Sequence, residues 1–290
     1  MDLPPLASRA GPPPFVLHRP ARQTMPLVFA SPHSGRDYPP AFLAAARLDP
    51  LSLRKSEDSF VDELFAAAPR HGAPLIAASF PRAFCDANRE PWELDPEMFS
   101  EPLPEWVNSA SPRIGAGLGT IARVVASGSV IYRDKLSFAE AEARIRCCWE
   151  PFHASLAALI ADTRKAFGAC LLIDCHSMPA PPIPAGRRVD FVLGDAYGTT
   201  CAEPVVRLIE DILAGLGYRV RRNDPYSGGY ITRHYGRPRE GVHALQLEIA
   251  RDLYMDEARI EPLAGFASLR EGIERLLSRL SSGAGTIFPA

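Results

Sequence analysis

The amino-acid sequence predicts an α/β fold, with a central mixed, largely parallel sheet flanked by helices. Two observations predict it. Short apolar runs alternate along the chain with longer amphipathic segments, as strands and helices do in this class. The chain also has 290 residues, of which 47% are hydrophobic and 23% charged, which is ordinary for a globular protein with a sizeable core.

The predicted strands are short apolar runs, and several of them end in a polar segment. The first run opens at Met25 and is followed by Ser31 to Gly35. The others cover residues 73–80, 170–174, 189–193, 218–222 and 242–249.

Four segments have helical spacing of their apolar residues. The first, 56–68, begins with Ser56 as a plausible N-cap and an acidic first turn. The second, 137–167, is long and is expected to break or kink at Pro151. The last two are 203–216, which stops at Gly217 as at a helix C-cap, and 264–281.

The chain is interpreted as a Pro-rich N-terminal arm over residues 1–24 and one domain over residues 25–290, without internal repeats. The Pro-rich stretch 179–186 is short and is expected to be a loop. The N-terminus lacks the basic start and apolar core of a secretory signal. No apolar run approaches the roughly 20 residues that a membrane helix needs, so no membrane partner is expected.

The net charge and the pattern of cysteines argue against several kinds of partner and binding site. A net charge of −2 gives no reason to expect nucleic acid or an anionic membrane surface as a partner. The six cysteines include no CxxC pair, so neither a zinc knuckle nor a disulfide framework is expected. A reducing, cytoplasmic location is the simplest interpretation. The oligomeric state is not indicated.

Two predicted strands end in a polar segment with a His-Ser pair, SPHSG at 31–35 and DCHSM at 174–178. Ligands of open α/β sheets bind outside the carboxyl ends of the strands, where His33 and His176 could share one ion. A catalytic zinc usually has three protein ligands, so a carboxylate from Glu57 or Asp58 is expected as the third. Each histidine could instead be structural, and the carboxylates could interact with the dipole of the helix predicted there.

Glu248 lies in the otherwise apolar strand predicted over residues 242–249, on the same face as Gln246. A carboxylate seldom occupies such a strand without a partner or a task. Burial would raise its pKa toward the range where it can take and return a proton near neutral pH. The structural alternative is a salt bridge, with Arg251 as the candidate partner.

Arginine and glycine residues follow other predicted strands. Arg82 and Arg89 stand on either side of Asp86, and a guanidinium group suits bidentate capture of a substrate carboxylate. Either arginine could instead pair with Asp86. The segment 223–236 is predicted to be a loop, and its Gly-Gly pair allows close approach of the backbone to a ligand.

Five segments, in this order, resemble the N-formylglutamate amidohydrolase (deformylase) family. They are SPHSG at 31–35, EDSFVDELF at 57–65, PRAFCDANR at 81–89, LLIDCHSM at 171–178 and NDPYSGGYITRHYGRPREGVHALQLEIARDLYM at 223–255. The resemblance covers nearly the whole chain and is most specific in the last segment. It implies a sheet flanked by helices with zinc at the strand tips, similar to zinc carboxypeptidases and the phosphorylase/hydrolase-like folds.

The resemblance also implies zinc-dependent hydrolysis of N-formyl-L-glutamate, or of a close N-acyl amino acid, to formate and glutamate. This small-molecule reaction belongs to amino-acid metabolism. The implied zinc ligands are His33, Asp58 and His176, with Glu57 in place of Asp58 if the register is shifted by one residue. Glu248 would occupy the position of the general base.

Further roles follow from the same resemblance. Arg82 or Arg89, with Asn88, would hold the substrate carboxylates, and one of the arginines would stabilise the oxyanion. Asp174 would orient a ligand histidine. The residues expected to line the substrate side are Tyr226, Gly228, Gly229 and Thr232.

The sequence departs from the family pattern at Ser59, Ala87 and the segment 115–136. Members that serve histidine breakdown tend to have an aromatic residue at the first position and Leu at the second. These changes leave the metal chemistry intact but open the choice of substrate. The alternatives are a zinc hydrolase of another N-acyl amino acid or small peptide, and an inactive protein that binds an acidic metabolite.

Overall fold

The structure is a computed structural model that describes residues 13–180, 188–283 and 287–288. It contains the predicted sheet, whose seven strands lie in the order β1-β3-β2-β4-β7-β5-β6. Strand β2 runs parallel to β3 and β4, and β4 runs parallel to β7. Strands β1 and β5 are antiparallel to their neighbours β3 and β7, and β6 is parallel to β5. The strands are β1 (Phe15–His18), β2 (Leu27–Ser31), β3 (Leu75–Ala78), β4 (Cys170–Met178), β5 (Phe191–Gly194), β6 (Val220–Arg222) and β7 (Val242–Ala250), and β8 (Met255–Asp256) and β9 (Glu261–Pro262) form a separate ribbon.

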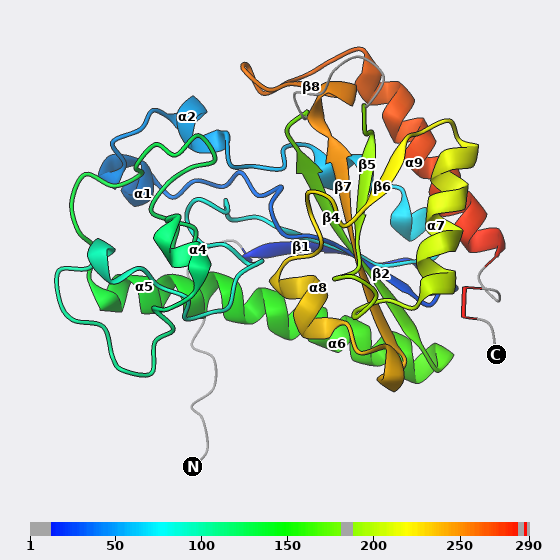
Figure 1. Ribbon diagram of the computed structural model, residues 1–290, viewed down its shortest axis with the longest axis horizontal. Helices are drawn as coiled ribbons and strands as arrows, with labels where there is room; N and C mark the ends of the chain where they lie inside the picture. The colour runs from blue at the N-terminus through cyan, green and yellow to red at the C-terminus, as the bar shows by residue number, and fades with distance from the viewer. Residues whose placement is uncertain (1–12, 181–187, 284–286, 289–290) are drawn as a thin grey trace.

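Helices cover both faces of this sheet, as Figure 1 shows. Helices α7 and α9 lie together on one side, and α5 and α6 lie on the other. The helices are α1 (Pro40–Ala45), α2 (Pro50–Arg54), α3 (Val61–Leu64), α4 (Pro112–Gly115), α5 (Phe138–Arg144), α6 (Glu150–Phe167), α7 (Glu203–Gly215), α8 (Tyr230–Tyr235) and α9 (Gly265–Ser282). Short 3₁₀ turns are η1 (Ala68–His71), η2 (Pro96–Met98), η4 (Pro238–Glu240) and η5 (Arg251–Leu253), and η3 (Ile145–Trp149) is a π-helical turn.

Side chains alternate between the two faces of the sheet and form a hydrophobic core on each face. On one of these faces the side chains become polar toward the carboxyl ends of β4 and β7. On β7, Leu245 and Leu247 pack in the core under α7 and α9, while Ala244 packs in the core on the α6 side. Beyond Ala244, that second face continues with Gln246 and Glu248. Strand β4, paired in register with β7, continues the same face with Asp174 and His176.

The structure corrects two expected boundaries near this polar face. The helix predicted over 56–68 is reduced to α3, which follows Phe60 in a left-handed conformation (φ 67°), so Glu57 and Asp58 precede the helix. The cause is tertiary, because the backbone N–H of Asp58 donates to the carbonyl of His33 (2.9 Å) and holds this turn against the end of β2.

The second corrected boundary is the end of the strand predicted over 170–174. Strand β4 extends to Met178, so its polar residues belong to the strand and do not follow it. They stay in strand conformation because each of them pairs with a residue of β7.

Other expectations are confirmed with local differences. The helix does not break at Pro151, but a π-helical turn, η3, interrupts its regular winding just before that residue, and Pro151 lies in the first turn of α6. Helix α7 ends just before Gly217, which has a left-handed φ of 91°. The segment 223–236, expected to be a loop, contains helix α8.

Part of the expected N-terminal arm joins the sheet, since β1 pairs with β3 at its edge. Residues 1–12 and most of the loop expected over 179–186 lie outside the described residues, and the division between arm and domain stays a prediction. No helix within the described ranges is long and apolar enough to cross a membrane.

Candidate active site

One cavity of about 510 Å³ opens at the carboxyl ends of the parallel strands. His33 follows β2, and the segment 82–89 follows β3. His176 belongs to β4 and Glu248 to β7. Four neighbouring strands thus deliver polar groups to one place, which is where the sheet topology predicts a ligand site.

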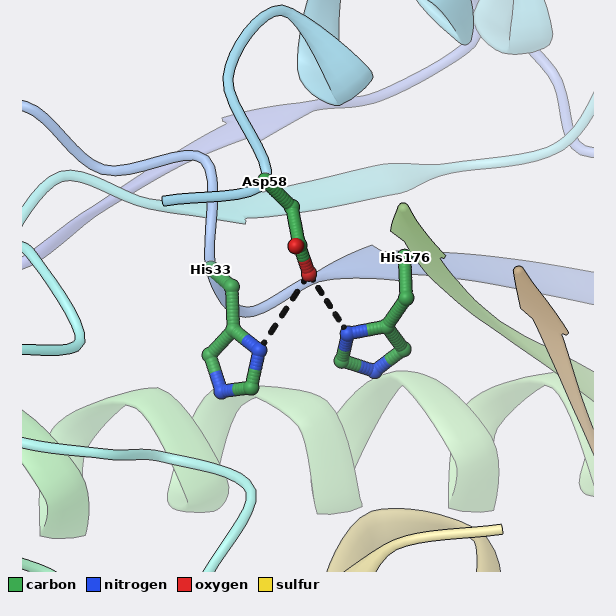
Figure 2. A group of neighbouring side chains, drawn as sticks. All are labelled: His33, Asp58 and His176. Atoms are coloured by element: carbon green, nitrogen blue, oxygen red, sulfur yellow. Dashed lines mark hydrogen bonds and ion pairs between the residues drawn. The ribbon is translucent and has the colours of Figure 1, made fainter. Parts of the chain in front are cut away.

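His33, Asp58 and His176 converge as a candidate metal-binding group. One ligand atom from each lies within 4.8 Å of the others, and all three residues are buried. Figure 2 shows the Asp58 carboxylate between the two imidazole rings. Its Oδ2 is 3.4 Å from Nδ1 of His33 and 2.9 Å from Nδ1 of His176. Two imidazoles and one carboxylate are a donor set that suits zinc and related divalent ions.

The contacts of His33 fit a metal ligand. Its Nε2 lies 2.7 Å from Oδ1 of Asp86, which also accepts a hydrogen bond from the backbone N–H of Asn88 (2.8 Å). A carboxylate on one imidazole nitrogen fixes the tautomer and leaves a lone pair on the other. That other nitrogen, Nδ1, is buried and has no hydrogen-bond partner among the described residues. A divalent ion would satisfy this nitrogen.

His176 is held in a similar way from its far side. Its Nε2 lies 3.0 Å from Oδ1 of Asp174 and 3.1 Å from Nδ2 of Asn88. Burial lowers the pKa of His176, but the carboxylates of Asp174 and Asp58 outweigh it and raise that pKa well above its usual value.

Asp58 is fixed through its second oxygen. Oδ1 accepts hydrogen bonds from Ser177 (3.1 Å) and Arg251 (3.0 Å). Burial raises the pKa of Asp58, but the neighbouring imidazoles of His176 and His33 outweigh this effect and hold that pKa well below its usual value.

Glu57, the alternative third ligand, points elsewhere. Its carboxylate accepts hydrogen bonds from Tyr38 (2.8 Å), Arg54 (3.0 Å) and Ser59 (2.8 Å). It is Asp58 that lies between the two histidines.

Glu248 faces the same cavity from the neighbouring strand. The carboxylate oxygen Oε1 of Glu248 accepts a hydrogen bond from the side-chain amide nitrogen of Gln246 (2.7 Å). The side-chain amide oxygen of Gln246 in turn accepts a hydrogen bond from the backbone N–H of Gly229 (2.6 Å). Burial raises the pKa of Glu248 to about 7. The expected alternative, an ion pair between Glu248 and Arg251, does not occur in the described part of the chain. Arg251 instead pairs with Asp58 and Glu257.

The two arginines after β3 differ in their partners. Arg82 pairs with Asp86 (2.9 Å), as the structural alternative for one arginine predicted. Arg89 donates from Nε to the carbonyl of Leu118 (2.9 Å) and from Nη1 to the carbonyl of Asn88 (2.8 Å). Both line the cavity.

Three of the four residues expected on the substrate side line the cavity: Tyr226, Gly228 and Gly229. Thr232 does not, because it is fully buried and its hydroxyl donates to Oδ2 of Asp174 (3.3 Å). Gly229 allows a close approach, since a Cβ there would lie 2.4 Å from Nδ2 of Asn88.

The sequence analysis assigned no functional role to several cavity residues, although it named Asp86 as a possible ion-pair partner of Arg82 or Arg89. Asp86 was visible in the segment PRAFCDANR, and Gln246 shares a strand face with Glu248, so alternation could have identified both. Arg113 and Arg233 also line the cavity; Arg233 lies in the segment 223–255 that resembles the family, whereas no spacing or motif signals Arg113.

The α/β fold and this group of side chains together define a hydrolase-type site with a candidate metal centre. The chain belongs to the N-formylglutamate amidohydrolase family, whose model it matches over residues 25–255. The chain is 31% identical to the N-formylglutamate deformylase of Pseudomonas aeruginosa over 265 residues, which is 89% of this chain and 92% of that protein.

A solved structure agrees with this assignment. The crystal structure of N-formylglutamate amidohydrolase from Ralstonia eutropha aligns with a TM-score of 0.88 at 39% identity, covering 94% of this chain and 99% of that one. A metallo-carboxypeptidase from Pseudomonas aeruginosa aligns with a TM-score of 0.37 at 12% identity, over 94% of this chain and 61% of that one. Family membership implies a small-molecule substrate similar to N-formylglutamate.

Proposed function

We propose that this protein hydrolyses the amide bond of N-formyl-L-glutamate to formate and glutamate, with zinc as its metal. The observation that carries the proposal is the shared cavity, in which the carboxyl group of Glu248 faces the candidate ligands His33, Asp58 and His176. Family membership supports the reaction class. The His-Asp-His donor set, in which Nδ1 of His33 lacks a hydrogen-bond partner within the described part of the chain, supports the metal.

Each group then has a defined task. When bound, a zinc ion supplies Lewis-acid polarisation of the formyl carbonyl group and acidifies the attacking water. Glu248 accepts a proton from that water while the new C–O bond forms, and returns it to the nitrogen when the C–N bond breaks. A pKa of about 7 suits both halves of this transfer near neutral pH.

The surrounding side chains hold these groups in place. Asp86 and Asp174 orient the imidazoles of His33 and His176. Gln246 orients Glu248 and ties it to the backbone of Gly229, on the segment expected to contact substrate. In the proposed reaction the guanidinium group of Arg82 stabilises the oxyanion and that of Arg89 holds a substrate carboxylate, which their position in the cavity lining supports.

The test is formate release from N-formyl-L-glutamate by the purified full-length chain, with and without a chelator and with zinc restored. We expect activity that is lost on chelation and recovered with zinc. Elemental analysis should find about one zinc per chain. Formate release that is unaffected by complete removal of metal would contradict the proposal.

A second substrate remains a candidate because the segment that departs from the family pattern forms part of the cavity wall. Leu118, Ala122, Val124 and Ala126 line that wall with apolar side chains. Another N-acyl amino acid could therefore be the better substrate. A panel of N-formyl, N-acetyl and peptidyl substrates, compared by kcat/KM, would decide between them.

A further inference from the structure

Part of the cavity wall is an irregular segment that connects β6 to α8 (Figure 1). Within it, residues 226–229 form what we call the wall segment, because Tyr226, Gly228 and Gly229 line the cavity. On its inner side, the backbone N–H of Gly229 donates to Gln246, which in turn donates to Glu248. The position of the wall segment therefore affects both the substrate side of the cavity and the proposed base.

The outer side of the wall segment rests on the end of β5 and on the turn that follows. The backbone N–H of Ala196 donates to the carbonyl of Ser227 (2.7 Å). At Gly194, the last residue of β5, a Cβ would lie 2.8 Å from the backbone nitrogen of Gly228 and 3.0 Å from the carbonyl oxygen of Tyr226. The wall segment can approach β5 this closely because Gly194 has no side chain.

The turn after β5 has a backbone that needs support. Ala196 and Tyr197 both have a left-handed φ, of 50° and 57°. A Cβ makes this conformation costly, so two such residues in a row persist only where other contacts hold them. Packing of the Tyr197 ring does not do so, because that residue is 75% exposed.

The side chain of Asn223 supplies the missing contacts. Its Oδ1 accepts hydrogen bonds from the backbone N–H groups of Asp195 (3.1 Å) and Tyr197 (3.3 Å), and its Nδ2 donates to Oδ1 of Asp195 (2.7 Å). The backbone N–H of Asn223 also donates to the carbonyl of Leu193 (2.9 Å), at the end of β5. Asn223 itself has a left-handed φ of 57°, which asparagine tolerates better than most residues.

The two polar atoms of the Asn223 amide act in opposite directions, one as acceptor and one as donor. An aspartate at this position would keep the acceptor for the two N–H groups but would set a second carboxylate against that of Asp195, which is buried. A glycine would keep the left-handed backbone and lose all the hydrogen bonds of the side chain. These two substitutions therefore separate the role of the side chain from that of the backbone.

We infer that Asn223 is a positioning residue that holds the wall segment in place through the turn 195–197. It is not among the residues that line the cavity in the described part of the chain, and it acts through the hydrogen bond from Ala196 to Ser227. The inference rests on the proposed function, whose substrate side it orders. When the turn relaxes, fewer molecules have the wall segment in place, and the apparent affinity for substrate falls by that fraction.

Amide hydrogen exchange of the full-length protein tests whether Asn223 holds the wall segment. In N223G, the amides of Ala196 and Gly229 should exchange about 10- to 100-fold faster than in the wild type, on the scale of several lost hydrogen bonds. N223D should change the exchange of both amides in the same direction. Because N223D is isosteric with the wild type, it decides the question should N223G not fold.

Steady-state kinetics separates positioning from stability. With the substrate that the wild type hydrolyses best among N-formyl, N-acetyl and peptidyl amino acids, the KM of N223G should rise about tenfold while kcat stays within about twofold, because saturating substrate restores the ordered wall. A loss of folded protein alone would lower the apparent kcat and leave KM unchanged.

The control is N108G, the same substitution at an asparagine outside the cavity lining of the described chain. The Asn108 side chain also forms a hydrogen bond, to Glu90 (2.7 Å), so N108G also loses side-chain contacts. It should leave KM and the exchange of Ala196 and Gly229 at wild-type values. Unchanged exchange in N223G, or faster exchange with a wild-type KM, would overturn the inference.

The same measurements distinguish this inference from the proposed function. If the wild type hydrolyses no member of the substrate panel, the proposed function is wrong, and the exchange of Gly229 alone decides whether Asn223 holds the wall segment. If the wild type releases formate from N-formyl-L-glutamate and N223G matches it in exchange and KM, the reaction stands and the role of Asn223 is wrong.

Discussion

Acidification is predicted to destabilise this protein through His153, a buried histidine of α6 behind the candidate active site. Its Nε2 donates to the carbonyl of Ala87 (2.8 Å), and its Nδ1 lies 2.9 Å from the hydroxyl of Tyr235. The ring also stacks on Trp149 at a centroid distance of 3.8 Å. Burial, reinforced by the nearby charge of His234, lowers the pKa of His153 from 6.5 to about 4.

The direction and the size of this destabilisation depend on the difference between the pKa of His153 in the folded and in the unfolded chain. Between about pH 4 and pH 6.5 the unfolded chain binds more protons, so the free energy of unfolding rises with pH in this window. The contribution is complete above about pH 6.5 and is lost as the pH falls through about 4. The full loss is about 3 kcal/mol, of which about 2 kcal/mol is lost by about pH 5.

Urea unfolding followed by tryptophan fluorescence, at about pH 7.5 and about pH 5, measures this loss. Other groups also titrate in this range, so the comparison is with H153Q, which can keep a donor toward Ala87 but cannot be protonated. H153Q should lose about 2 kcal/mol less than the wild type between the two pH values. The control H18Q, at an exposed position of β1, should behave as the wild type. An equal pH dependence in H153Q and the wild type would refute this account of His153.

Three further predictions concern the site directly. H176A should lose both bound metal and activity, because one of the three proposed ligands is removed; an unchanged metal stoichiometry would rule out its role as a ligand. E248Q should keep its metal but lose about 100-fold or more in kcat, the scale of general acid–base catalysis, and a near-normal turnover would place the base elsewhere. G229A should displace the side chain of Asn88, which a Cβ would approach to 2.4 Å, and should cost about 1–3 kcal/mol in unfolding free energy together with activity. G115A, where a Cβ would meet nothing within 4 Å, is its control and should be close to neutral in both assays.

The spacing of apolar residues, together with the residues that mark the ends of elements, predicted most of the sheet and the longer helices. The apolar runs of β4 and β7 were recognisable because strands buried on both faces are nearly continuously hydrophobic. Helices α7 and α9 were recognisable from their spacing and, for α7, from Gly217 at its end. These signals are local, so they can be read without knowing which residues meet.

Boundaries at the site were less predictable, for a physical reason. The helix expected over 56–68 is shortened because its first residues bind to the end of β2. The polar residues at the end of β4 stay in the strand because β7 pairs with them. In both places a long-range contact overrides local propensity.

The residue types needed for the chemistry are visible in the chain as written: two His-Ser pairs after apolar runs, adjacent acidic residues at 57 and 58, and one carboxylate in an apolar strand. Their assembly required the folded molecule. Asp58 and not Glu57 faces the histidines because Tyr38, Arg54 and Ser59 hold the Glu57 carboxylate away. Arg113 and Arg233 line the cavity from the short helices α4 and α8, where no periodic pattern marks the direction of a side chain. Side-chain chemistry is encoded locally, whereas the distances that make it a site depend on contacts between segments far apart in the chain.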